Sequence, residues 1–235
     1  MTHTSMTAEQ NAAVREYLIE KKLSTVKMTV LGRFLSGRRK LLQRLTLGLP
    51  LELYDPSENG EHRMIVHVKT HPVILDFSMR LGNEWPVQDP WHHQIVQQGE
   101  GFLLVYDVTD RASFELLHGI HSELFGPTEE GKPLWVLATK TDQPQQKWVV
   151  SNQEGEEFSK SIGATFRSVS AHTGEGLGKV DAADMASWVI LSKIPKPVET
   201  EGSSKAPGAN TAQTRRFSLH SLRNKVNRLL HKETK

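Results

Sequence analysis

A turn bounded by two glycines is the first segment of this chain whose residue types and spacing could bind a ligand. It reads Gly32-Arg33-Phe34-Leu35-Ser36-Gly37-Arg38-Arg39, after a β-rich run and before a helical apolar pattern. Glycines at this separation let backbone N–H groups surround a phosphate, when Lys and then Ser or Thr follow the second glycine. Here Arg38 keeps the positive charge, whereas Arg39 puts a cation where a hydroxyl would hold Mg²⁺. The pattern predicts a phosphate-binding loop; the alternative is an ordinary strand–turn–helix with incidental glycines.

Two polar segments follow later strands. One is Thr139-Lys140-Thr141-Asp142, and the other begins with Ser170-Ala171. Each comes directly after an apolar, β-rich run, and ligands of parallel sheets bind at the carboxyl ends of strands. We therefore expect both segments near the glycine-bounded turn, although either could be a solvated loop.

The elements that must position these residues alternate between strand and helix. Strands are expected near 26–31, 63–69, 73–76, 102–106, 134–138 and 165–168, and helices near 7–23, 40–47, 112–124, 151–162 and 177–194. This alternation is typical of an α/β fold with a mostly parallel sheet and helices on both faces. The segment 77–98 does not fit one pattern and is expected to mix loop and short helix.

Four regions are expected along the 235 residues. These are an N-terminal helical extension over 1–25, a domain over 26–194, a disordered linker over 195–213 and a basic amphipathic helix over 214–235. The last region has seven Lys or Arg and one acid, hence a charge of +6, against +2 for the whole chain. Such a helix suits an anionic membrane or a calmodulin-like groove, or it could dock on its own domain.

Composition excludes several classes of function. Without cysteine there is no disulfide, thiolate catalysis, Cys-ligated zinc or prenyl or palmitoyl anchor. The first residues have no apolar signal-peptide core. His92 and His93 are adjacent and would not share one face, and no Gly-x-Ser-x-Gly motif is present. Aromatic residues do not interleave with basic ones, so no nucleic-acid partner is expected.

Together the motifs resemble a Ras-type small GTPase over residues 26–193, most strongly over 99–114 (Gly-Glu-Gly-Phe-Leu-Leu-Val-Tyr-Asp-Val-Thr-Asp-Arg-Ala-Ser-Phe). Within that family the chain is similar to the oestrogen-regulated growth-inhibitor branch. The resemblance implies a six-stranded Ras-like G domain that binds GTP or GDP. It further implies that Asp142 accepts two hydrogen bonds from guanine, that the Lys140 stem covers the base and that the Ala171 N–H meets the guanine carbonyl. Thr139 and Ser170 complete these motifs.

The same resemblance leaves Mg²⁺ binding open. Tyr54-Asp55-Pro56-Ser57 is similar to the effector loop, which would give Ser57 a metal-ligating role. Asp76 matches the Asp of the Asp-x-x-Gly motif, although the next glycine, Gly82, is too far along, and Asn83 is the sole candidate to orient water across an insertion. These departures predict weak Mg²⁺ dependence and little hydrolysis.

Three functions therefore stay open. The preferred one is a divergent small G protein that binds guanine nucleotide and acts as a signalling module. The others are a working GTPase switch and a nucleotide-free scaffold that acts through its basic tail. The expected location is the cytoplasm, which the resemblance implies; the nucleus and, through the basic tail, a membrane surface are the alternatives.

Overall fold

The computed structural model describes residues 6–21, 24–48, 62–79, 97–125 and 132–194. The chain divides into two units, Met1–Ile194 and Pro195–Lys235. The second unit lies outside the described residues, and with it the expected linker and basic helix. Within the described ranges, no helix has the length and apolar character needed to cross a membrane.

A six-stranded sheet forms the centre of the first unit, in the order β2-β3-β1-β4-β5-β6. The strands are β1 (Ser24–Gly32), β2 (His62–Val68), β3 (His71–Met79), β4 (Gly101–Asp107), β5 (Leu134–Thr139) and β6 (Thr165–Ser168). β2 and β3 pair antiparallel, and every other pairing is parallel. The expected α/β fold with a mostly parallel sheet is confirmed.

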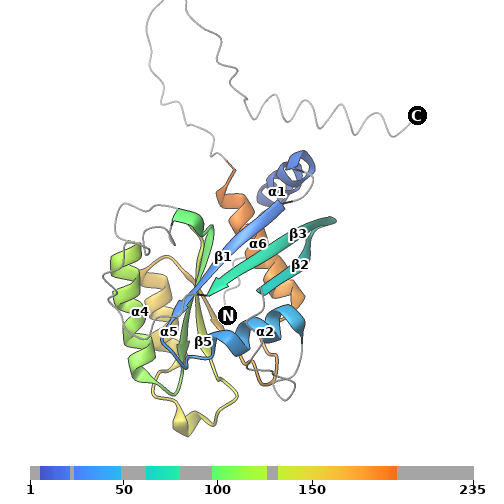
Figure 1. Ribbon diagram of the computed structural model, residues 1–235. Helices are drawn as coiled ribbons and strands as arrows, with labels where there is room; N and C mark the ends of the chain where they lie inside the picture. The colour runs from blue at the N-terminus through green and yellow to red at the C-terminus, as the bar shows by residue number, and fades with distance from the viewer. Residues whose placement is uncertain (1–5, 22–23, 49–61, 80–96, 126–131, 195–235) are drawn as a thin grey trace, which may run out of the picture. The chain divides into compact units, whose positions relative to one another are not determined.

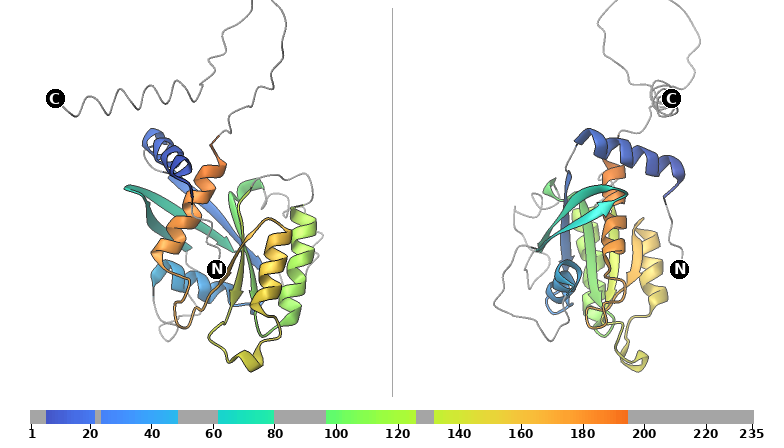
Figure 2. Two further views of the ribbon diagram at one scale, coloured as in Figure 1. Left: turned by 180° about the vertical axis from the view of Figure 1, so that it is seen from behind. Right: turned by 90° about the vertical axis from the view of Figure 1, so that its right-hand side faces the viewer.

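Helices cover both faces of this sheet (Figure 1). They are α1 (Ala8–Lys21), α2 (Arg38–Leu47), α4 (Arg111–Leu124), α5 (Asn152–Ser161) and α6 (Lys179–Ser192), with a short 3₁₀ turn η2 (Gln145–Lys147). α2 and α6 pack on one face and α4 and α5 on the other. Figure 2 shows α1 at the end of the sheet where β1 begins, opposite to the loop that carries η2.

The central strand β4 shows why helices cover both faces of the sheet. All seven of its residues are buried. Leu103 and Val105 join the core under α2 and α6, whereas Phe102, Leu104 and Tyr106 join the core under α4 and α5. A strand buried on both faces has a continuous apolar sequence rather than an alternating one.

The Gly-Glu-Gly segment before β4 has a structural role. A Cβ on Gly101 would lie 2.7 Å from a Val189 side-chain atom and 2.8 Å from the Met28 sulfur. The carboxylate of Glu100 accepts a hydrogen bond from the Lys27 N–H at 2.8 Å and forms an ion pair with Lys193 at 2.7 Å. The segment thus joins β1 to the end of α6.

Strand β3 runs three residues beyond the expected end at Asp76. Its alternation continues, because Val73, Leu75 and Phe77 are all buried in the same core. Asp76 therefore lies inside the strand, opposite Lys27 of β1, and Met79 ends it opposite Val30.

Candidate functional site

The turn between β1 and α2 has a backbone that requires both of its glycines. Gly32 has φ +149° and Gly37 has φ +89°, values that residues with a Cβ rarely adopt. A Cβ on Gly32 would lie 2.2 Å from the Val105 carbonyl oxygen. The Ser36 N–H donates to the Arg33 carbonyl at 3.2 Å, which closes the turn. The glycines of this loop are therefore not incidental.

The first turn of α2 is strongly basic. It holds Arg38, Arg39 and Lys40, has no acid, and starts at Gly37, which offers no side-chain cap. Helix N-termini favour anions, and cations in the first turn oppose the helix dipole. Arg38 is 5% exposed, and this burial lowers its pKa. The charge and the backbone suit a polyanion such as a phosphate chain.

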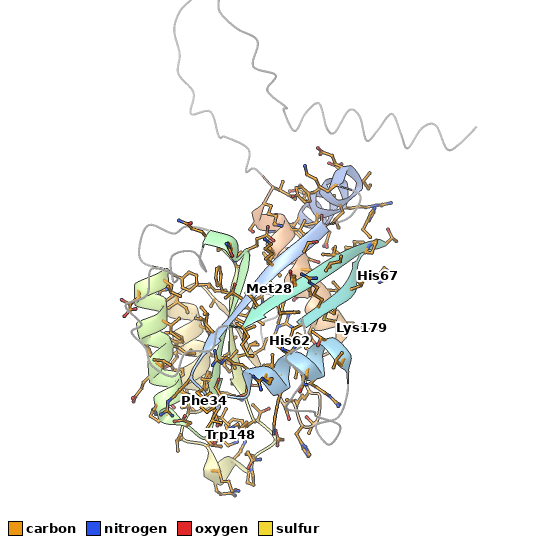
Figure 3. The ribbon with its side chains drawn as sticks, viewed as in Figure 1. Met28, Phe34, His62, His67, Trp148 and Lys179 are labelled. Atoms are coloured by element: carbon orange, nitrogen blue, oxygen red, sulfur yellow. The ribbon has the colours of Figure 1, made fainter. Side chains whose placement is uncertain are left out.

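Arg39 lies in α2, which packs against strand β2. Burial lowers the pKa of His62 on that strand, and the positive charge of Arg39 lowers it further. Figure 3 shows His62 beside α2. Arg39, which stands at the position of a metal-ligating hydroxyl, is thus close enough to His62 to affect its protonation.

Thr139 connects the second motif to the turn. It is buried at the end of β5, and its Oγ1 lies 2.7 Å from the Ser36 carbonyl oxygen and 2.8 Å from that of Tyr106. Its hydroxyl can donate to either. The structure therefore brings Thr139 and the glycine-bounded turn together, as expected.

Lys140 follows in a left-handed conformation, with φ +61°. Its Nζ lies 2.5 Å from Oδ2 of Asp107, at the end of β4. Oδ1 of Asp107 accepts hydrogen bonds from the N–H and the hydroxyl of Thr109, both at 2.8 Å. A buried carboxylate held from two sides thus orients the lysine stem along this edge of the sheet.

Asp107 was not singled out from the sequence. The signal that could have found it is the parallel pairing of β4 and β5, which sets Asp107 opposite Thr139. Finding that register requires knowing where both strands end.

Asp142 and Ser170 form the third contact. The Ser170 hydroxyl donates to Oδ1 of Asp142 at 2.6 Å and accepts from the Thr173 N–H at 3.1 Å. Burial alone would raise the pKa of Asp142, but hydrogen bonds, with that from Ser170 first, lower it overall. Asp142 is therefore an exposed carboxylate that is oriented and charged at neutral pH. Ala171 follows Ser170 directly and is half-buried.

Asp76 does not reach this edge of the sheet. It pairs with Lys27, five residues before Gly32 along β1, and both of its oxygens accept hydrogen bonds from Arg63 at 3.0 and 3.2 Å. Met79 instead ends β3 and stands three residues before Gly82, which is the spacing of Asp-x-x-Gly. Ser57 and Asn83 lie outside the described residues, so their roles stay predictions.

Comparison with known proteins decides the family. The family model described as "Ras family" matches residues 27–184. The "Ras-related and estrogen-regulated growth inhibitor" of Homo sapiens is 32% identical over 158 residues, which are 66% of this chain and 76% of that protein; the Bos taurus protein has the same values. The "Ras-like protein rasC" of Dictyostelium discoideum is 29% identical over 147 residues, or 62% of this chain and 77% of that protein.

The chain belongs to the Ras family. It is a Ras-like small G protein, and its described residues bring the three motifs to one edge of the sheet.

Mg²⁺, which the family typically uses, does not fit the described residues of this Ras-family chain. Mg²⁺ prefers oxygen ligands in near-octahedral geometry. In the described ranges, no group of three or more His, Cys, Asp or Glu could hold a metal ion. The nearby carboxylates are engaged by cations, since Asp107 binds Lys140 and Asp110 binds Arg33. The side chains of Arg39 and Met79 contain no oxygen.

Proposed function

We propose that this Ras-family chain is a guanine-nucleotide-binding signalling module with weak or absent GTP hydrolysis. The observation that carries the proposal is the contact between Ser170 and Asp142, which fixes a charged carboxylate beside Thr139 and Lys140. Guanine presents two neighbouring N–H donors on one edge, and a carboxylate is their natural partner.

The residues of the phosphate-binding motif support weak hydrolysis. Phosphoryl transfer depends on well-placed cations and an oriented water molecule. Arg38 and Arg39 replace the usual Lys and hydroxyl, and Asn83 is the only sequence candidate for the water-orienting residue. A working GTPase is the alternative, and it would hydrolyse GTP in a reaction that the Asp142→Ala substitution and EDTA both abolish.

The basic tail supports a further part of the proposal. Its charge of +6 over residues 214–235 favours an anionic membrane surface or an acidic groove such as that of calmodulin. We place the protein in the cytoplasm, with reversible binding to one of these partners. Co-sedimentation of the full chain with anionic vesicles tests binding to a membrane. If the protein does not co-sediment at low salt, binding to calmodulin or a nuclear location remains.

The test of guanine recognition exchanges one hydrogen-bonding group. Asp142→Asn should weaken GDP binding roughly 10- to 100-fold, because hydrogen bonds to a charged group are lost. The same variant should bind xanthosine diphosphate more tightly than the unchanged chain does, since the new amide can donate to the extra carbonyl of xanthine. Glu156→Gln, which removes an exposed carboxylate on α5, is the matched control and should change neither affinity. Equal GDP affinity in all three proteins would contradict the proposal.

A further inference from the structure

We propose that this chain binds the phosphates of its nucleotide without a divalent metal, and that Arg39 supplies the charge that Mg²⁺ supplies in related sites. The inference rests on the proposed function, because it concerns the same nucleotide site. It begins from the disagreement between the donor groups present and the ligands that Mg²⁺ requires.

The first support is the place of Arg39 in the fold. It is the second residue of α2, two residues after Gly37, so its backbone lies in the first turn of the helix that follows the glycine-bounded turn. A guanidinium there repels a divalent cation but offers planar, paired N–H donors that match phosphate oxygens.

The second support is the end of β3. A strand that ended at Asp76 would bring a carboxylate to the edge where the phosphate loop lies. The observed strand continues, and it leaves Asp76 bound to Arg63 and ends with Met79, a thioether. Magnesium binds oxygen, and sulfur ligands suit softer metals. Met79 at the end of β3 and Arg39 in α2 thus have no side-chain oxygen that could ligate the metal.

The third support is the charge balance around the loop. The nearby carboxylates of Asp107 and Asp110 are already neutralised by Lys140 and Arg33. The α2 N-terminus, with its three cations, has no acid in its first turn. Arg39 in this first turn would attract a bound polyphosphate and repel an added Mg²⁺.

The experiment measures binding of a fluorescent GDP to the full chain, once with Mg²⁺ and once with EDTA. The inference predicts affinities that agree within about threefold, because no binding step uses the metal. Binding that is more than about tenfold tighter with Mg²⁺ would overturn the inference and leave the proposed function standing. Absence of binding under both conditions would overturn the proposed function itself.

Two variants locate the effect. Arg39→Ser should weaken binding in EDTA roughly tenfold or more, because a charge-assisted contact to phosphate is lost. A double variant with Arg39→Ser and Met79→Asp should bind GDP more tightly with Mg²⁺ than with EDTA, since both side chains then carry an oxygen. Met79→Leu keeps the apolar side chain and is the control that should behave like the unchanged protein. If the double variant folds by circular dichroism and still binds GDP equally with and without Mg²⁺, these positions are not what removes the metal.

Discussion

Leu35 lies at the tip of the phosphate loop in a conformation that favours glycine. Its φ is +68°, and its side chain is 74% exposed. For a residue with a Cβ this left-handed region costs about 1–2 kcal/mol. The exposed side chain contributes little packing in return, so this turn holds backbone strain that packing does not offset.

Replacing Leu35 by Gly should stabilise the protein. Relief of the strain outweighs the added chain entropy of glycine, which is about 0.5–1 kcal/mol, so the net gain is about 0.5–1 kcal/mol. For a domain of this size that raises Tm by roughly 2–3 °C, measured by thermal unfolding without nucleotide. Leu35→Ala keeps the Cβ and should give no gain. A Tm that rises equally in both variants would assign the effect to the exposed side chain instead.

Helices α4 and α5 are joined at their N-terminal ends by one ion pair. Glu154 takes part in the capping box of α5 with Ser151, and its Oε1 accepts from Arg111, the first residue of α4, at 2.7 Å. The hydrogen bond from Arg111, followed by that from the Ser151 backbone, lowers the pKa of Glu154 from 4.5 to about 2. The two helices are thereby coupled through a single carboxylate.

This coupling predicts a definite pH dependence. Because the folded-state pKa lies below the unfolded one, the contribution of Glu154 is fully present above about pH 4.5 and is lost as the pH falls towards about 2. Glu154→Gln should therefore lower the free energy of unfolding at pH 7, and its difference from the unchanged protein should shrink at acidic pH. Urea unfolding at pH 7, 4 and 3 measures this, with Glu156→Gln as the control. A difference that stays constant across this range would contradict the role given to the charge.

At the scale of elements, the strands could be predicted because their apolar runs are continuous and end at turn residues. The end of β3 could not be predicted. Aspartate is typical of a strand end, so Asp76 suggests that the strand stops there, and the alternation of apolar residues through Phe77 is a weaker signal. The role of Asp107 depends on the register of β4 against β5, which no local pattern encodes. The conformation of Leu35 was hidden for a similar reason, because a leucine gives no sign of a left-handed turn.

At the scale of the whole first unit, the site residues gather at one edge of the sheet. The phosphate loop follows β1, Lys140 follows β5 and Ser170 follows β6. Helix α1 packs at the opposite end, where Val14 and Leu18 join the core, and so it lies away from the nucleotide site (Figures 1 and 2). In the described residues the three motifs thus meet at this edge, and Arg38 and Arg39 take the places of the usual Lys and hydroxyl.

The measurement that tests this account most directly is a single-turnover experiment on the full chain. The protein is loaded with GTP, separated from free nucleotide and incubated with Mg²⁺, and the nucleotide it releases on denaturation is identified by chromatography over several hours. The account predicts a guanine nucleotide on the protein that remains GTP throughout, with Asp142→Asn failing to retain it. Steady conversion to GDP would show a working GTPase, and a protein that retains no guanine nucleotide would contradict the proposed function.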